Sequence, residues 1–489
     1  MNAFGTAAYV WLRQGLVCSG AIAALHGCGA GSKVTTPQRP TASAGAGGAA
    51  NAHVDDSNAA QRSERAPIES AARCGSAPTL DLNPIGSPLG GALDRLVAAR
   101  RKIGKIRGWD LELPLVARRV GESEQIALLG EEMSCLQPEA VSHAFDAALS
   151  MLGLLPAGFD TRRALLDQYR REPRSVYLTS RRLVAVPQAA PDDTLERSLV
   201  HELAHVYQDS LYRLGERIAY AEGGNDRTAA YHSFAEGEAL LLDLESQSSP
   251  WGKPPPSSDE LAALLEQASL RVDLPRVLQL SIVAPYADGY QFVSYLRKLG
   301  GWQLVDQIWK RGLASSSELL HPERWVTDCL TGTCPPVGSP SRLSNPVSGD
   351  PGNPPRLAES VGEQGLRVVL ETVVNREAAR RLSAGYLADD LAVVARAGLT
   401  EVAWQLRLER ADSAQELLPL LAQALSPNDP NHSPSDCTFN ERAVLALRRN
   451  GRDIFVLGRA HGDTWTASAR RRECQSVCAR MAGLGWQVQ

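Results

Sequence analysis

The sequence predicts an α+β fold, with a mainly helical domain that carries a small sheet, followed by a small C-terminal α+β domain. Three observations lead to this prediction. Apolar residues recur at helical spacing from Leu195 to Val206, which indicates a helix docked into a core. Residues 175–187 just before it are rich in valine and leucine and predict a strand or hairpin. A Pro/Gly/Ser-rich linker at 335–356 precedes alternating helix and strand patterns over 357–489.

The other elements follow from the same periodicities and from turn residues at their ends. Asp160 can cap a helix that starts at Thr161, because its carboxylate can accept the first backbone N–H groups. In the first domain we expect a strand at 113–120 and helices at 89–107, 122–130, 138–152, 161–171, 261–270, 274–281 and from 284 towards 299. In the second we expect helices at 362–380, 413–425 and 467–484 and strands at 385–396, 400–409, 443–448 and 453–460.

The most informative stretch is His201-Glu202-Leu203-Ala204-His205, an H-E-x-x-H pattern. Two histidines four apart on a helix project from one face about one turn apart, so both imidazoles can reach a single metal ion. Glu202 stands beside the first histidine and can take the proton of an attacking water, as in a zinc hydrolase. The pattern therefore predicts zinc ligands at His201 and His205 and a general base at Glu202. The simpler interpretation is a core helix with two hydrogen-bonded histidines.

A catalytic zinc ion needs a third protein ligand. Downstream, Glu236-Gly237-Glu238-Ala239 resembles the E-G-x-A segment of gluzincin metallopeptidases, in which the glutamate before the glycine binds zinc. The resemblance implies that Glu236 is the third ligand. Glu238 is the competing carboxylate, and because it lies two residues further along a helix it faces away from Glu236. His232 shares the face of Glu236 and is a candidate for a ligand, a group that supports a ligand, or an oxyanion donor.

Composition indicates an ordinary soluble protein. The chain has 489 residues, enough for two or three domains, and its hydrophobic content is 44%. Its formal net charge is −4, so we do not expect it to bind nucleic acid.

The N-terminal segment resembles an export signal and is not expected to be part of the folded domains. Arg13 precedes an apolar run at 15–25 that is too short to span a bilayer. The run ends in Leu25-His26-Gly27-Cys28, which resembles a bacterial lipobox and implies that residues 1–28 are a signal peptide and that Cys28 is lipidated. The protein would then be anchored in the cell envelope, at the outer membrane or in the periplasm. A cleaved secretory signal is the alternative, and a short cytosolic tail is the simpler interpretation.

After Cys28 the chain changes character. Residues 29–74 are rich in Ala, Gly, Ser, Pro and Thr and lack apolar periodicity, which predicts a flexible, disordered tether. The mainly helical domain is therefore expected to occupy residues 75–334.

The cysteines fit export. Two of the nine fall in the signal, which leaves seven: Cys74, Cys135, Cys329, Cys334, Cys437, Cys474 and Cys478. We expect a local disulfide between Cys329 and Cys334, and a second one from Cys437 to Cys474 or Cys478. Because seven is odd, at least one thiol is unpaired unless the protein dimerises through it. No histidine accompanies the Cys474-x-x-x-Cys478 pair, so a second metal site is not expected there.

Four blocks in order resemble a family of largely uncharacterised bacterial secreted or lipoprotein zinc metallopeptidases of gluzincin type. They are the H-E-L-x-H-x-x-Q-D core at 201–209, the E-G-E-A segment, the P-Y-x-x-G-x-x-F-V segment at 285–293 and the L-H-P-E-R stretch at 320–324. The resemblance implies a zincin-like catalytic domain, zinc as the cofactor, and a peptide or protein substrate outside the cytoplasm.

Within this resemblance further residues become candidates. Tyr286 or Tyr290 can stabilise an oxyanion, although both are also expected as packing residues in a core. Asp209, four residues after His205, either orients a ligand histidine through its other ring nitrogen or is a solvated aspartate. The segment 175–187 is a candidate to pair with the substrate backbone by strand addition.

The first hypothesis is therefore an exported, lipid-anchored zinc peptidase. The second is a catalytically inactive zinc-binding lipoprotein that serves as a binding or scaffold module in the cell envelope. The presence of Glu202 favours the first, because an inactive site has no need of a base. A zinc amidase that acts on a non-peptide amide is a third, weaker hypothesis.

Overall fold

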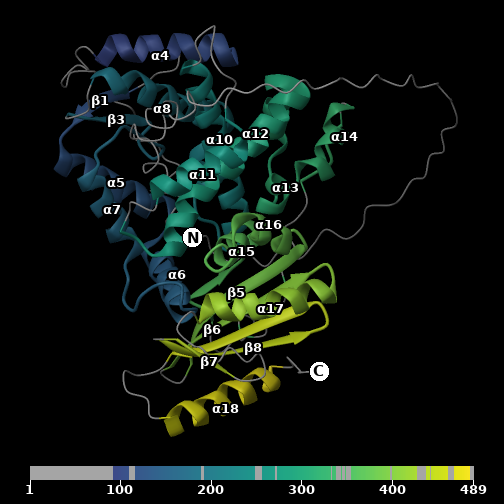
Figure 1. The fold of residues 1–489 in the computed structure, drawn as a ribbon. Coiled ribbons are helices and arrows are strands. Elements are labelled where there is room, and N and C mark those ends of the chain that lie inside the picture. Colours follow the sequence, from purple (N-terminus) through teal and green to yellow (C-terminus); the bar gives the residue numbers. More distant parts are fainter. Residues whose placement is uncertain are drawn as a thin grey trace, which may run out of the picture.

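A computed structural model describes most of the chain from residue 92 to residue 484. The gaps within this range are 110–115, 189–191, 248–255, 270–272, 332, 338–342, 344–346, 348–353, 397–398, 427–436, 441 and 461–466. The predicted signal peptide, Cys28, the tether and most of the linker lie outside the described residues. The described part confirms the α+β fold class: a largely helical region with a small sheet is followed by a six-stranded antiparallel sheet (Figure 1).

The small sheet has the strand order β1-β3-β2. Its strands are β1 (Val116–Val120), β2 (Val176–Leu178) and β3 (Leu183–Pro187). β1 runs parallel to β3, and β2 and β3 form the antiparallel hairpin expected in this segment. Helices α5 (Glu122–Leu136) and α7 (Thr161–Arg171) contribute apolar side chains to the same cluster, and Asp160 caps α7 as expected.

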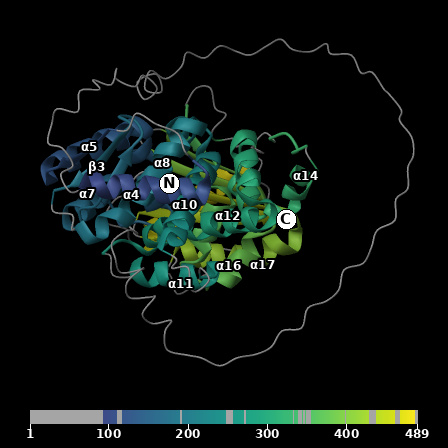
Figure 2. The same ribbon diagram turned by 90° about the horizontal axis from the view of Figure 1, so that it is seen from above.

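Three long helices form the centre of the helical region. They are α8 (Asp192–Tyr212), α10 (Asn225–Gln247) and α12 (Arg276–Arg311), and α10 contacts both of the others (Figures 1 and 2). The segments expected as separate helices at 274–281 and from 284 towards 299 form one helix with Pro285 inside it. α12 then kinks at Gly300 and Gly301, whose backbone angles are not helical. The other helices are α4 (Ala92–Arg107), α6 (Glu139–Met151), α9 (Leu214–Ile218), α11 (Ser258–Ser269), α13 (Ser316–Leu320), the 3₁₀ turn η1 (Pro322–Arg324) and α14 (Val326–Leu330).

Two glycines set the distance between α10 and α12. A Cβ atom on Gly237 would lie 1.9 Å from the carbonyl carbon of Gly289, and one on Gly289 would lie 1.7 Å from the carbonyl oxygen of Ser233. The two backbones therefore touch at this crossing, which no larger residue permits. The glycines of the E-G-E-A and P-Y-x-x-G segments are thus needed for helix packing.

The second sheet has the order β4-β5-β6-β9-β8-β7, with antiparallel neighbours throughout. Its strands are β4 (Leu357–Glu359), β5 (Tyr386–Arg396), β6 (Leu399–Leu408), β7 (Thr438–Phe439), β8 (Ala443–Asn450) and β9 (Asp453–Ala460). The helices of this region are α15 (Gly362–Leu370), α16 (Arg376–Ser383), α17 (Ala411–Leu425) and α18 (Ala467–Gly483). The single helix expected at 362–380 is wrong: it divides into α15 and α16, because the Asn375 side chain accepts the Ala378 N–H and starts a new helix.

The two regions share one hydrophobic core. Phe145 and Leu149 of α6 and Leu278 of α12 belong to the same cluster as Leu391 and Trp404 of the second sheet. Within the described residues, no helix has the length and apolar character needed to cross a membrane.

Polar contacts also cross between the regions. Glu359 of β4 is fully buried and accepts hydrogen bonds from the backbone N–H groups of Gly223, at 3.0 Å, and Asn225, at 3.2 Å, where α10 begins. Arg367 of α15 donates to the buried Asp288 of α12 at 2.6 Å. A carboxylate at a helix N-terminus satisfies N–H groups that have no partner within the helix. The C-terminal region thus supports α10 directly.

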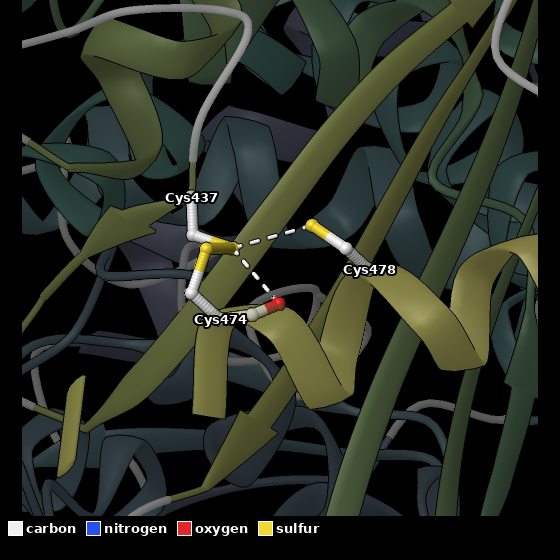
Figure 3. Close-up of side chains that lie close together, drawn as sticks. All are labelled: Cys437, Cys474 and Cys478. Carbon is white, nitrogen blue, oxygen red and sulfur yellow. Dashed lines mark hydrogen bonds between the residues drawn. A yellow bond between two sulfur atoms is a disulfide. The ribbon is translucent and has the colours of Figure 1, made fainter. Parts of the chain in front are cut away.

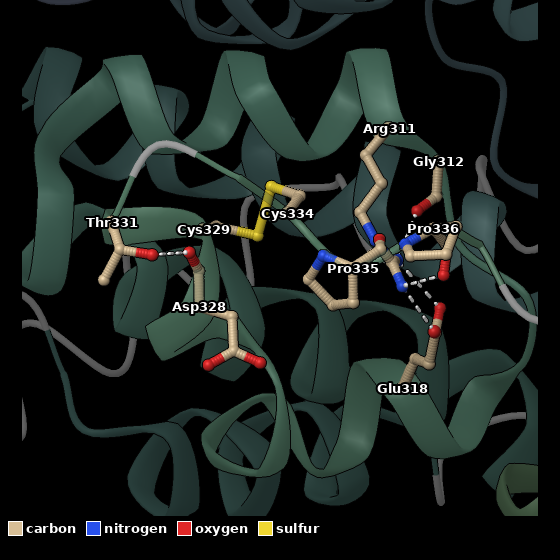
Figure 4. The surroundings of a disulfide bond; sticks show 9 residues. All are labelled: Arg311, Gly312, Glu318, Asp328, Cys329, Thr331, Cys334, Pro335 and Pro336. Atoms are coloured by element: carbon tan, nitrogen blue, oxygen red, sulfur yellow. Dashed lines mark hydrogen bonds and ion pairs between the residues drawn. A yellow bond between two sulfur atoms is a disulfide. The ribbon is translucent and has the colours of Figure 1, made fainter. Parts of the chain in front are cut away.

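Two disulfides have both of their cysteines among the described residues. The expected bond between Cys329 and Cys334 is present, and Cys437 is bonded to Cys474 (Figures 3 and 4). Cys135 is also disulfide-bonded, and Cys478 is the free cysteine among the described residues. These disulfides indicate that the protein works in an oxidising or extracellular compartment.

We predict that the Glu359→Ala substitution destabilises the protein. It removes the acceptor of the partly buried Gly223 N–H and of the buried Asn225 N–H. We therefore expect the free energy of unfolding to fall by about 1–3 kcal/mol in urea titrations. The exposed Glu409 provides the control, because Glu409→Ala removes no described side-chain contact. Equal unfolding free energies for the two variants would show that β4 does not stabilise α10.

Candidate metal centre

The H-E-x-x-H residues lie in the middle of α8 on its buried side. The apolar stripe predicted from Leu195 to Val206 is buried, which confirms that the helix docks into the core. His201 and His205 follow one another by about one turn, and their ring centroids lie 4.7 Å apart. Both side chains are at most 1% exposed, so α8 presents its two imidazoles to the protein interior.

Glu236 meets these histidines from α10. Its Oε2 atom lies 3.1 Å from His201 Nε2 and 3.9 Å from His205 Nε2. One ligand atom from each of the three residues falls within 4.8 Å of the others, and all three residues are buried. The sequence therefore identified three side chains that converge on one point.

The donor set fits a zinc ion. Two imidazole nitrogens and one carboxylate oxygen form a ligand set that catalytic zinc commonly has in proteins. The Oε1 atom of Glu236 is buried and accepts no hydrogen bond from the described residues, although His232 Nε2 lies 3.3 Å away. A carboxylate in such surroundings is costly unless a positive charge offsets it, and a bound divalent cation would supply that charge.

A hydrogen-bonded chain fixes the orientation of His205. Its Nδ1 lies 2.7 Å from Gln208 Oε1, so Nδ1 carries the proton and Nε2 faces Glu236. Gln208 Nε2 in turn donates to Glu238 Oε2 at 2.9 Å. Glu238 also accepts from Arg107 Nε and Trp309 Nε1, each at 2.8 Å. Glu238 is therefore not the third ligand: it pairs with Arg107 and holds the glutamine that orients His205.

The prediction that Asp209 orients a ligand histidine is wrong for His205. Asp209 Oδ2 accepts from the Tyr177 hydroxyl and its Oδ1 from the Gly215 N–H, both at 2.8 Å. The residue at the third position after His205, not the fourth, reaches the ring nitrogen. Sequence reasoning missed this role of Gln208 because both spacings place a side chain on the same helix face.

Glu202 contacts the small sheet. It is fully buried, and its Oε2 accepts the Tyr177 N–H at 2.8 Å. The next outward-facing amide of this hairpin, Thr179 N, donates to Glu132 at 2.9 Å. The N–H groups of Tyr177 and Thr179 thus already donate to side-chain carboxylates. A substrate backbone therefore cannot pair with these two N–H groups, as was suggested for this segment. Tyr177 instead fixes the carboxylate next to the histidines.

The two candidate tyrosines of α12 lie in different surroundings. Tyr286 is 1% exposed, and its ring stacks on that of His201 with centroids 6.4 Å apart. The Tyr290 hydroxyl donates to the Pro256 carbonyl at 2.7 Å. Tyr286 thus lies beside a candidate ligand, whereas the Tyr290 hydroxyl is committed to a loop.

Tyr169 of α7 is a further residue near the centre. It is 2% exposed, and its hydroxyl has no hydrogen-bond partner among the described residues. Burial raises the pKa of this hydroxyl well above its ordinary value, Arg174 lowers it, and the charges of Glu202 and Glu236 raise it again. The hydroxyl therefore remains neutral and keeps its proton. No motif surrounds Tyr169, so it could not be identified from the sequence.

Comparisons of the chain with protein-family models, curated proteins and solved structures found no match. The family resemblance seen in the four sequence blocks therefore has no support from these comparisons. The structure supports a more general statement than membership of this family. It contains a buried His-His-Glu group in a helical region, with the spacing and ligand types of a zincin-like metal site.

We predict that Gln208→Leu weakens metal binding without unfolding the protein. The leucine removes the hydrogen-bond partner of His205 Nδ1, and loss of such an orienting contact typically lowers metal affinity by about 10–100-fold. Competition with a zinc chelator measures this affinity. Gln303→Leu on the exposed surface of α12 is the matched control and should leave affinity unchanged. Wild-type affinity in Gln208→Leu would contradict the orienting role.

Proposed function

We propose that this protein is an exported zinc-dependent peptidase. The observation that carries the proposal is the convergence of His201, His205 and Glu236 within 4.8 Å, next to the fully buried carboxylate of Glu202. Two histidines and a carboxylate as ligands, with a glutamate adjacent to the first histidine, are the combination that metal-assisted hydrolysis of an amide requires.

Each residue then has a defined task. A bound zinc ion would polarise the substrate carbonyl and the attacking water. Glu202 takes the proton from that water and passes it to the leaving amine. The Tyr177 N–H, 2.8 Å from Glu202 Oε2, holds the carboxylate in position while it does so. Tyr286, beside His201, is the better candidate for donating to the oxyanion, since Tyr290 already binds Pro256.

The substrate in this proposal is a peptide or protein outside the cytoplasm. The disulfides support a location in an oxidising compartment. The lipobox-like sequence before Cys28 supports attachment to the cell envelope through a lipid anchor. Two acyl chains hold a protein at a membrane far more firmly than one, which suits an enzyme that must stay in the envelope.

One observation favours the second hypothesis, an inactive zinc-binding module of the envelope. His201, Glu202, His205 and Glu236 are each at most 1% exposed, so a substrate cannot reach them in this conformation. The tight contact of Glu202 with Tyr177 is also what a purely structural carboxylate would show. The two hypotheses differ in one measurable property, which is turnover.

We predict that Glu202→Gln retains zinc and loses hydrolysis. Glutamine keeps the hydrogen bond to Tyr177 but cannot accept a proton, so cleavage of a proteome-derived peptide library should fall at least about 100-fold, as measured by mass spectrometry. Glu222→Gln, at an exposed position, should cleave at the wild-type rate. Wild-type cleavage by Glu202→Gln would rule out this base. Absence of cleavage by the zinc-loaded wild-type protein would favour the inactive module.

A further inference from the structure

Three cysteine sulfurs meet where α18 packs on the second sheet. Cys437 directly precedes β7, whereas Cys474 and Cys478 lie four residues apart on one face of α18 (Figure 3). Cys437 is bonded to Cys474, and the Sγ atom of Cys478 lies 3.5 Å from Cys437 Sγ. A thiol is therefore in contact with a disulfide that it does not belong to.

A positively charged side chain contacts the sulfur of Cys478. Arg448 of β8 donates to its Sγ at 3.3 Å. A guanidinium carries its positive charge at all relevant pH values, and disulfide exchange proceeds through attack by a thiolate. Cys478 is half-buried rather than sealed in the core, so small thiols and alkylating reagents reach it. The sulfur of Cys478 therefore contacts a disulfide, lies beside a positive charge and belongs to a partly exposed residue.

We propose that Cys437, Cys474 and Cys478 form a thiol–disulfide exchange site. The Cys478 thiolate attacks Cys437 Sγ, a bond forms between these two sulfurs, and the bond from Cys437 to Cys474 breaks. The electron pair leaves on Cys474, which takes up the proton that Cys478 has lost. The exchange needs no oxidant or reductant, because one disulfide and one thiol are present before and after.

The exchange would change how α18 is attached. Moving the bond from Cys474 to Cys478 shifts the anchor point by four residues, or about 6 Å along the helix axis. Val477 and Met481, on either side of Cys478 in the sequence, pack α18 against the sheet. Two disulfide isomers of the same chain are the result, each with one thiol accessible to a mixed disulfide with a small thiol.

The disulfide between Cys329 and Cys334 provides an internal comparison. Its surroundings include Asp328, Thr331 and Pro335, and none of the residues drawn around it is a third cysteine (Figure 4). A metal site at the sulfur trio is disfavoured, because metals bind thiolates and two of the three sulfurs form a disulfide. Exchange is therefore expected at the C-terminal disulfide and not at the other one.

Labelling of the wild-type protein tests the proposal. The protein is incubated at neutral pH without added thiol, quenched with acid, alkylated and digested with trypsin. Cys474 and Cys478 fall in one peptide, Glu473 to Arg480, so fragment ions identify the labelled sulfur. We expect the label on both cysteines, in a ratio that becomes constant with time, and none on Cys329. Label confined to Cys478 at all times would overturn the proposal.

The Cys474→Ser variant provides a second test that does not depend on exchange rates. It should form a disulfide between Cys437 and Cys478, seen as a linked peptide and a mass two hydrogens lower than that of the dithiol. The matched control is Cys334→Ser, which should leave Cys329 as an alkylatable thiol. If Cys437 and Cys478 were both alkylated in folded Cys474→Ser under air, the two sulfurs would not be positioned to exchange.

Discussion

The contact on which the rest of the structure depends is that of Glu236 Oε2 with the Nε2 atoms of His201 and His205, at 3.1 and 3.9 Å. It joins two helices, α8 and α10, through side chains that are fully or almost fully buried. A buried carboxylate is unfavourable without a positive charge beside it. The cluster therefore has the composition of a cation-binding group, and the helices that carry it must be held firmly enough to keep the three atoms together.

That support comes from distant parts of the sequence. Gly237 and Gly289 let α10 and α12 touch, and Glu359 of the second sheet satisfies the N-terminus of α10. Arg107 of α4 reaches His205 through Glu238 and Gln208. Such hydrogen-bonded chains orient a metal ligand and raise its affinity. The C-terminal region is consequently part of the apparatus that positions the centre.

Much of this was predictable from the sequence, for a physical reason. Helical periodicity and the four-residue spacing fix which face carries His201 and His205, and both are local properties of the chain. The α+β class followed in the same way. The partners of Gln208 and Asp209 were not predictable, because they depend on how α8 packs against α10 and β2. The division of the segment 362–380 into two helices depended on one capping side chain, Asn375, whose effect periodicity does not reveal.

The most direct test of the metal centre is to measure the zinc content of the purified protein and its X-ray absorption spectrum at the zinc edge. The account predicts one equivalent of zinc, bound by two imidazole nitrogens and one carboxylate oxygen, and loss of this zinc in both His205→Ala and Glu236→Ala while the protein stays folded. A folded wild-type protein that binds no zinc, or one whose zinc remains after either substitution, would contradict it.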